Sequence, residues 1–267
     1  MIDPRLERAL AFERAMHAAT GRVITASWGQ AFLDAALSRC YERNQVRTFA
    51  DAGGLDAEAL HREVDGVFRR AGLAHRQVCV QPPAVRRLGD PLARLGYERA
   101  RHRFLAFTGA PPPPPRAAVV ELDLATALTA QERYLTTDPD TPYGRDRRTR
   151  EDLLEHHRTY GASAQERRFG ILDAGGAGVA WAKLWTRDDA AQIEDVVCLQ
   201  DHRGRGYGRD VVAAAALAAL AADPGLLFIV ADAEDWPIGL YRRLGFEDVG
   251  EVQIFTRLLP GAPGALA

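Results

Sequence analysis

The sequence has few of the residues that build disulfide frameworks, metal centres or membrane spans. Only three of its 267 residues are cysteines, and Cys40, Cys79 and Cys198 form no CxxC pair. Metal and disulfide roles are therefore disfavoured, and Cys79 and Cys198 lie in apolar runs where a buried thiol is expected. No apolar stretch reaches the length of a membrane span, since the alanine-rich run from Val211 to Ala222 is too short. We expect neither a metal ion nor a membrane partner.

The chain also lacks a strong excess of charge of either sign. It has 34 Lys and Arg against 36 Asp and Glu, a formal net charge of −2, which argues against nucleic acid as the main partner. The first residues, Met1 to Glu7, show no signal-peptide pattern. Hydrophobic residues make up 47%, which is enough for two cores. We expect a soluble, cytoplasmic protein, and the abundant alanine, arginine and proline are typical of a high-GC bacterial gene.

The most informative stretch is a basic, glycine-rich segment, Arg203-Gly204-Arg205-Gly206-Tyr207-Gly208. It follows a strand-like run, 193–198, and opens into a helical run, 209–222. In such a loop, glycines let backbone N–H groups point at an anion, and the helix N-terminus and arginines add positive charge. No Gly-Lys-Ser/Thr closes it and its spacing is not G-x-G-x-x-G, so it is neither a Walker A loop nor a good Rossmann match. The segment is interpreted as a pyrophosphate-binding loop; a solvent-exposed basic turn before a core helix is the alternative.

The spacing Arg-x-x-Gly-x-Gly resembles the acyl-CoA pyrophosphate loop of the GNAT superfamily of N-acetyltransferases. Further along, Tyr241-x-x-Leu244-Gly245-Phe246 is similar to the second signature of that superfamily. Two signatures in the same order are more specific than either alone. The order of elements around them, β-α-α-β-β-β-α-β-α-β, is that of a complete GNAT domain, and the resemblance covers roughly residues 116–260. Strands are predicted at 117–122, 168–172, 179–186, 192–198, 226–230 and 252–258, and helices at 124–134, 149–160, 209–222 and around Leu240.

The first half of the chain resembles a degenerate copy of the second half. Arg94-Leu95-Gly96-Tyr97-Glu98 repeats Arg243-Leu244-Gly245-Phe246-Glu247, and an apolar, aromatic strand follows each. We therefore predict a mixed α/β (α+β) fold with two GNAT-like acyl-CoA N-acyltransferase domains in tandem. The run Pro111 to Pro115 predicts a stiff spacer between them. The predicted parts are a degenerate, structural domain at 1–109, a linker at 110–116, an acetyltransferase domain at 117–260 and a flexible tail at 261–267.

The two copies differ in chemistry. Before its helix, predicted at 57–70, the first half has no Arg-x-x-Gly-x-Gly, and Asp51 and Asp56 would repel a pyrophosphate. Leu92 stands at the position that matches Tyr241. We expect only the second half to bind acetyl-CoA.

The resemblance also implies site residues. Backbone N–H groups of Val196, Val197 and Cys198 would polarise the thioester carbonyl. Tyr241 matches the family tyrosine that protonates the departing thiolate; a helix tyrosine packed on the sheet is the alternative. The remaining cofactor-binding residues would be Arg203, Gly204, Arg205, Gly206, Tyr207, Gly208 and Arg209.

The base that removes the amine proton is Glu194 or Asp232. Alternation along the strand predicts that Glu194 shares a face with Gln192, while Asp195 faces the other way. Many family members carry a glutamate two residues earlier, where this chain has Gln192. Asp232 follows the next strand of the predicted sheet.

The acceptor is not specified by the sequence. Trp181 and Trp185 share a strand face, where they pack in the core or form the floor of an acceptor pocket. We expect acetyl transfer from acetyl-CoA to the primary amine of a small molecule by direct attack, without a metal. A non-catalytic acyl-CoA-binding module and an enzyme acting on a protein amine are the alternatives, and a homodimer is left open. Acidic residues expected near the site, which suit a cationic amine or an ordinary surface, are Glu194, Asp195, Asp232, Glu234 and Asp235.

Overall fold

The computed structural model describes residues 2–139, 141–260 and 262. Within them the strands form one mixed, eleven-stranded sheet in the order β1-β2-β3-β4-β11-β5-β10-β9-β8-β7-β6. The strands are β1 (Arg22–Ala26), β2 (Gly29–Leu33), β3 (Gln45–Thr48), β4 (His75–Val80), β5 (Glu98–Phe107), β6 (Val120–Glu121), β7 (Gln165–Leu172), β8 (Gly178–Arg187), β9 (Ala190–Cys198), β10 (Leu226–Asp232) and β11 (Phe246–Leu258). The helices are α1 (Pro4–Ala18), α2 (Ala57–Arg70), α3 (Val85–Arg94), α4 (Leu124–Thr137), α5 (Arg147–Thr159), α6 (Tyr207–Leu220) and α7 (Pro237–Arg243).

The two halves share one topology. Strands β1, β2 and β3 form an antiparallel series, as do β7, β8 and β9. Helix α2 crosses from β3 to its parallel partner β4, and α6 crosses from β9 to its parallel partner β10. The repeated pentapeptides follow α3 and α7, and each has a glycine with left-handed backbone, Gly96 at φ +81° and Gly245 at φ +99°. The repeated motif therefore ends the last helix of each half in the same way.

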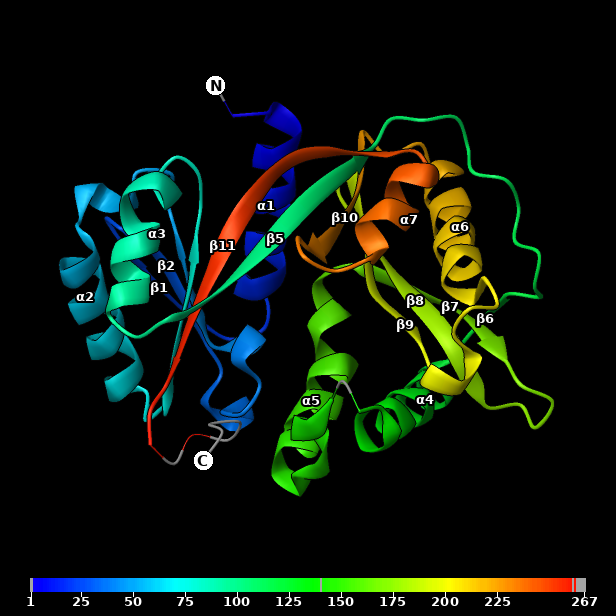
Figure 1. The fold of residues 1–267 in the computed structure, drawn as a ribbon, viewed down its shortest axis with the longest axis horizontal. Coiled ribbons are helices and arrows are strands. Elements are labelled where there is room, and N and C mark those ends of the chain that lie inside the picture. The colour runs from blue at the N-terminus through cyan, green and yellow to red at the C-terminus, as the bar shows by residue number, and fades with distance from the viewer. Residues whose placement is uncertain (1, 140, 261, 263–267) are drawn as a thin grey trace.

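The halves exchange their last strands. The final strand of the first half, β5, pairs with β10 of the second, and the final strand of the second, β11, pairs with β4 of the first. Figure 1 shows β5 and β11 running side by side across the middle of the molecule, where they pair antiparallel. The sheet is thus continuous through both halves, and the bounds 1–109 and 117–260 stay a prediction.

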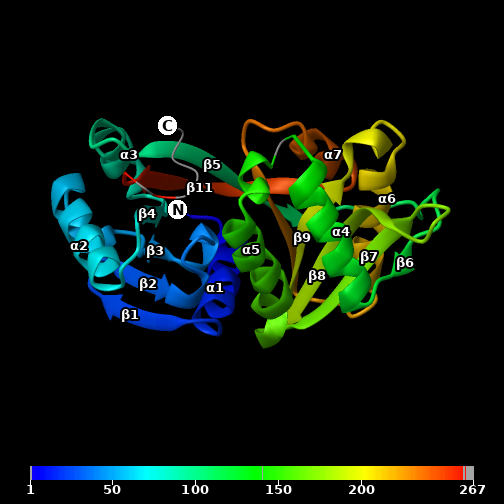
Figure 2. The same cartoon turned by 90° about the horizontal axis from the view of Figure 1, so that it is seen from below.

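A shared hydrophobic cluster joins the halves. Helix α1 lies at the seam between them and packs on β5, β10 and β11 (Figure 2). Its side chains Leu6, Phe12 and Met16 are buried in one cluster with Phe104 and Phe228. Two further clusters lie under the individual halves. Apolar burial in these three clusters stabilises both halves. The first half therefore belongs to the same packed unit as the second half, which contains the glycine-rich loop.

The predicted linker and its neighbours differ in detail from expectation. The strand expected at 117–122 is reduced to the two residues of β6, and at its predicted start the Ala117 N–H donates to Asp210 Oδ2 of α6, 2.9 Å away. The guanidinium of Arg209 donates to the carbonyls of Pro113 and Pro114, so the proline run lies against α6.

Of the tail predicted at 261–267, only Ala262 belongs to the described residues. Among the residues that the structure describes, no helix is long and apolar enough to cross a membrane. The cytoplasmic location stays a prediction.

Candidate functional site

The sheet opens between β9 and β10. The parallel pairing of these strands ends at Ile193 and Ile229. Beyond it, β9 stays paired with β8 and β10 with β5, so the two strands separate. The Leu199 N–H donates to the Val179 carbonyl on β8. By the alternation of an antiparallel ladder, the N–H of Cys198 then faces the opening.

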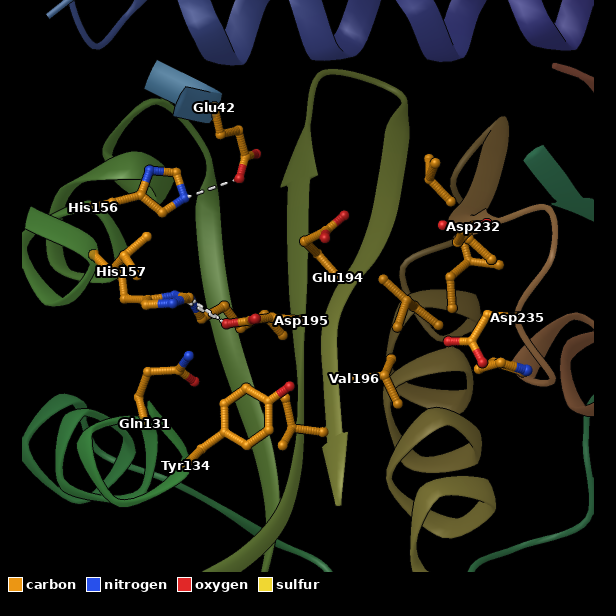
Figure 3. Close-up of a pocket in the computed structure, with 18 of the residues that line it drawn as sticks. Glu42, Gln131, Tyr134, His156, His157, Glu194, Asp195, Val196, Asp232 and Asp235 are labelled. Carbon is orange, nitrogen blue, oxygen red and sulfur yellow. Dashed lines mark hydrogen bonds and ion pairs between the residues drawn. The ribbon is translucent and has the colours of Figure 1, made fainter. Parts of the chain in front are cut away.

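A β-bulge in β9 brings two carboxylates to this opening. The pairing with β8 passes from Val197 opposite Trp181 to Glu194 opposite Lys183, and Asp195 has a left-handed φ of +57°. Glu194 and Asp195 therefore line the same cavity (Figure 3). The prediction that Asp195 faces away from Glu194 was wrong, because the extra residue in the bulge interrupts the two-residue alternation.

The glycine-rich loop forms one wall of a cleft, which we call the loop cleft. Gly204 and Gly206 have left-handed φ values of +77° and +84°, and a Cβ added at either residue or at Gly208 would meet no atom within 4 Å. The open N–H groups of the first turn of α6 follow directly. A cradle of this kind fits a pyrophosphate. The cleft has a volume of about 980 Å³ and includes Val196, Val197, Cys198, Arg203, Gly204, Gly206, Tyr207, Gly208, Arg209, Tyr134, Trp236 and Pro237.

The two arginines of the loop, and Arg209 after it, make different contacts. Arg205 does not line the cleft, and its guanidinium donates to the Asp201 carbonyl. Arg203 donates from Nε to the Cys198 carbonyl and from Nη2 to Asp138 Oδ2, 2.9 Å away. Arg209 donates to the proline run. In this conformation Arg203 and Arg209 hold the loop in place as well as lining the cleft.

A second cavity, which we call the strand cavity, continues from the loop cleft between the separated strands. It has a volume of about 390 Å³. Trp185 lines it and Trp181 does not, so Trp185 is the tryptophan that faces the opening. Residues common to the strand cavity and the loop cleft are Tyr134, Val196, Val197, Asp235 and Pro237. Residues of the strand cavity that carry polar groups include Glu42, Gln131, Tyr134, His156, His157, Lys183, Glu194, Asp195, Asp232 and Tyr241.

Glu194 has the properties of a base in the strand cavity. Its Oε2 accepts a hydrogen bond from Gln192 Nε2, 2.7 Å away. Burial, reinforced by the charges of Glu42 and Asp195, raises the pKa of Glu194 to about 8. A carboxylate with a pKa near the working pH can accept a proton from an ammonium group much more readily than an ordinary glutamate can.

Asp195 belongs to an ionic cluster instead. Its Oδ2 lies 3.0 Å from His157 Nδ1 (Figure 3). Lys183 Nζ lies 2.9 Å from the same oxygen and 2.7 Å from His157 Nδ1. Burial opposes its charge, yet His157 and Lys183 hold the pKa of Asp195 well below its usual range. Asp195 is therefore a poor base. Sequence reasoning missed His157 and Lys183, although Lys183 is the only lysine of the chain and lies within an apolar strand.

Two tyrosines are available as proton donors. Tyr241 is buried on α7 and lines the strand cavity, and burial raises its pKa. Tyr134 on α4 lines both the strand cavity and the loop cleft, and burial raises its pKa to about 12. Both phenols are neutral donors at pH 7. Tyr134 was not found from the sequence, because it lies outside both signatures.

The first half also contributes to the strand cavity. Glu42 lies in a short 3₁₀ turn, Tyr41–Arg43, and its Oε2 is 3.4 Å from His156 Nε2 of α5 (Figure 3). Burial opposes the charge of Glu42, but His156 lowers the pKa of Glu42 to about 2. Burial also lowers the pKa of His156, but the interactions with Cys40 and Glu42 outweigh burial and raise this pKa to about 10. The two side chains form an ion pair across the seam, and about half of the Glu42 side chain is exposed.

The equivalent place in the first half is closed by its own chain. Beyond the paired part of β3 and β4, the Gln81 N–H donates to Thr48 Oγ1, 3.2 Å away. The Asp56 carboxylate caps α2 by accepting from the Ala59 N–H at 2.8 Å. The anion position at this helix N-terminus is thus filled by a side chain of the protein.

We therefore expect one acetyl-CoA per chain, bound in the second half. Titration calorimetry should give a stoichiometry of one. Asp56→Ala, which opens the first-half helix N-terminus, should leave that value unchanged because no basic loop accompanies it. A measured stoichiometry of two would show that the first half binds as well.

Comparison with known proteins finds a family match for part of the second half. Residues 165–248 match the family described as acetyltransferase (GNAT) domain, and comparison with curated proteins gave no match. A conserved protein of unknown function from Staphylococcus epidermidis ATCC 12228 is similar in structure, with a TM-score of 0.66 at 13% identity over 90% of this chain and 94% of that one.

Two further solved structures have the same overall fold. The GCN5-related N-acetyltransferase from Kribbella flavida has a TM-score of 0.61 at 16% identity, over 98% of this chain and 97% of that one. A tandem GNAT protein from the clavulanic acid biosynthesis pathway has a TM-score of 0.53 at 16% identity, over 80% and 75%. These likenesses show the fold alone, and they confirm the predicted mixed α/β architecture. Residues 165–248 of the second half thus match the acetyltransferase (GNAT) domain family, within a chain whose fold is similar to that of a tandem GNAT protein.

Proposed function

We propose that the protein transfers the acetyl group of acetyl-CoA to the primary amine of a small molecule. The observation that carries this proposal is the continuity of the loop cleft and the strand cavity at the point where β9 leaves β10. A thioester held along the cleft and an amine held beside Glu194 would meet at Val196 and Val197, which line both. Because Glu194 lines the strand cavity and has a raised pKa, the site supports proton transfer as well as binding.

The reaction then follows from the groups in place. Glu194 takes a proton from the bound ammonium, and the neutral amine attacks the thioester carbonyl. The Cys198 N–H at the opening stabilises the negative charge that develops on the carbonyl oxygen. The new C–N bond forms as the C–S bond breaks, and the departing sulfur takes a proton from a tyrosine, for which we propose Tyr241. The attacking nitrogen gives its surplus proton to the resulting tyrosinate, which leaves a neutral amide, a neutral thiol and the proton held by Glu194.

The two alternatives are distinguishable. An acyl-CoA-binding module would need the loop cleft but not a base beside it, so Glu194 favours the enzyme. An enzyme acting on a protein amine would need a peptide-wide groove, whereas a cavity of about 390 Å³ suits a small molecule.

A panel of primary amines tests the proposal. With acetyl-CoA present, release of free thiol should rise with at least one amine above the slow release measured without an acceptor. Acetyl-CoA binding with no amine-dependent release across the panel would favour the binding module instead.

The role of Tyr241 has its own test. Tyr241→Phe removes one hydroxyl with almost no change in volume, so turnover should fall about ten- to a thousandfold while acetyl-CoA affinity stays nearly unchanged. Tyr134→Phe is the matched comparison, because Tyr134 also lines the strand cavity. If Tyr134→Phe shows the loss and Tyr241→Phe does not, Tyr134 is the acid and Tyr241 a packing residue.

A further inference from the structure

A third cavity, the seam cavity, extends the strand cavity into the first half. It has a volume of about 310 Å³ and receives side chains from α1, β3, β4, β5 and β11. The two cavities therefore form one continuous space from the thioester position to the first-half sheet. They share Glu42, Trp185, Glu194, Val230, Ala231 and Asp232 as lining residues.

The charges around the seam cavity are balanced at its far end. At that end Glu13 of α1 is paired with Arg47 of β3, and where the two cavities meet Glu42 is paired with His156. Burial lowers the pKa of both His17 and His102, so these imidazoles are neutral at pH 7.

The carboxylates without a cation partner lie where the two cavities meet. These are Glu194 and Asp232, which have no ion pair in the part of the chain that the structure describes. One ammonium group is thus accommodated beside Glu194 and Asp232, whereas a second ammonium deeper in the seam cavity would find no carboxylate free to receive it.

The far wall instead offers hydrogen bonds and aromatic faces. The amide groups of Gln45 and Gln192 donate to the Glu42 carbonyl and to Glu194, respectively. The Gln77 side chain lines the cavity and has no hydrogen bond to any described residue. Trp185 and Phe104 line the same space. The free amide group of Gln77 beside aromatic faces suits a ring that carries hydroxyls at its edge and C–H groups on its face.

We propose that the first half builds the far end of the acceptor site, and that the acceptor is a monoamine with an uncharged, hydroxyl-rich body of the amino-sugar or aminocyclitol kind. The proposal rests on the proposed acetyl transfer and adds a specificity role for the first half. Its ammonium lies beside Glu194 and Asp232, and its body lies in the seam cavity within reach of Gln77.

Transfer to D-glucosamine, 1,4-diaminobutane and spermidine, measured with the full chain, tests this inference. Glucosamine should have the highest kcat/KM. Gln77→Leu should raise the KM for glucosamine about three- to tenfold, the usual effect of one lost hydrogen bond, and leave acetyl-CoA affinity unchanged. Gln30→Leu on β2, outside the cavity, is the matched control and should change neither value. Gln77→Glu should shift preference toward spermidine, because it supplies a carboxylate at the far end.

The outcomes separate the two proposals. If the linear amines are preferred, or if neither Gln77 variant alters the choice among acceptors, the specificity role of the first half is wrong while the acetyl transfer stands. If no amine accepts an acetyl group, the proposed function fails and this inference fails with it. A Gln77→Leu protein that does not fold leaves the shift in preference of Gln77→Glu as the deciding measurement.

Discussion

Gly208→Glu should abolish acetyl-CoA binding in a protein that stays folded. Gly208 is the second residue of α6 and lines the loop cleft, and a side chain added there meets no atom within 4 Å. The fold should persist, because a carboxylate in the first turn of a helix is favourable. Binding should fall at least about a hundredfold, because the same carboxylate occupies the anion position and repels the pyrophosphate.

Calorimetry and thermal unfolding of the same variant check this expectation. Gly208→Ala is the matched control, since it adds one methyl group and no charge. Gly206→Glu should also abolish binding, but φ of +84° at Gly206 makes any side chain there strained, so a loss of stability would accompany it. Unchanged acetyl-CoA affinity in folded Gly208→Glu would mean that the glycine-rich loop does not hold the pyrophosphate.

Glu194→Gln should reduce turnover about a hundred- to a thousandfold at pH 7, with little change in acetyl-CoA affinity. Because the pKa of Glu194 is raised to about 8, the basic form is the minor one at pH 7 and grows as the pH rises. The wild-type turnover number should therefore increase through pH 8 and level off above it. The variant should lose this dependence and recover part of its activity at high pH, where more of the amine is already neutral.

Asp232→Asn is the control for this assignment. Asp232 lines the same cavity and is the second candidate base. We expect Asp232→Asn to weaken binding of the amine while the rise in turnover through pH 8 remains. If that rise disappears in Asp232→Asn and persists in Glu194→Gln, Asp232 is the base and the role given to Glu194 is wrong.

Short contiguous signals were readable from the sequence. The loop from Arg203 to Gly208 predicted a helix N-terminus with a glycine cradle, and the structure has it because each residue needed for that turn lies within six positions. The repeated Arg-Leu-Gly likewise predicted two similar structural units, and in each of them the motif ends a helix at a left-handed glycine. Both features, the glycine-rich turn and the helix end, are determined by residues that are close together in the sequence.

Contacts between segments that are far apart in the sequence could not be predicted from the sequence. The cluster of His157, Lys183 and Asp195 joins a helix to two strands, and only the packed fold brings the three side chains within 3.0 Å of one another. The bulge at Asp195 depends on pairing with β8, so alternation alone gave the wrong face. The entry of Glu42 into the strand cavity depends on the exchange of β5 and β11, which draws the halves together.

Counting thiol and acetylated product with and without an acceptor amine is the most direct test of transfer in the second half. Protein mixed with excess acetyl-CoA alone should release no stoichiometric burst of thiol, because the amine attacks the thioester directly. Adding an accepted amine should then release one thiol for each acetyl group found on the amine. A burst of one thiol per chain without any amine would contradict direct attack, and bound acetyl-CoA with no amine-dependent release would contradict acetyl transfer itself.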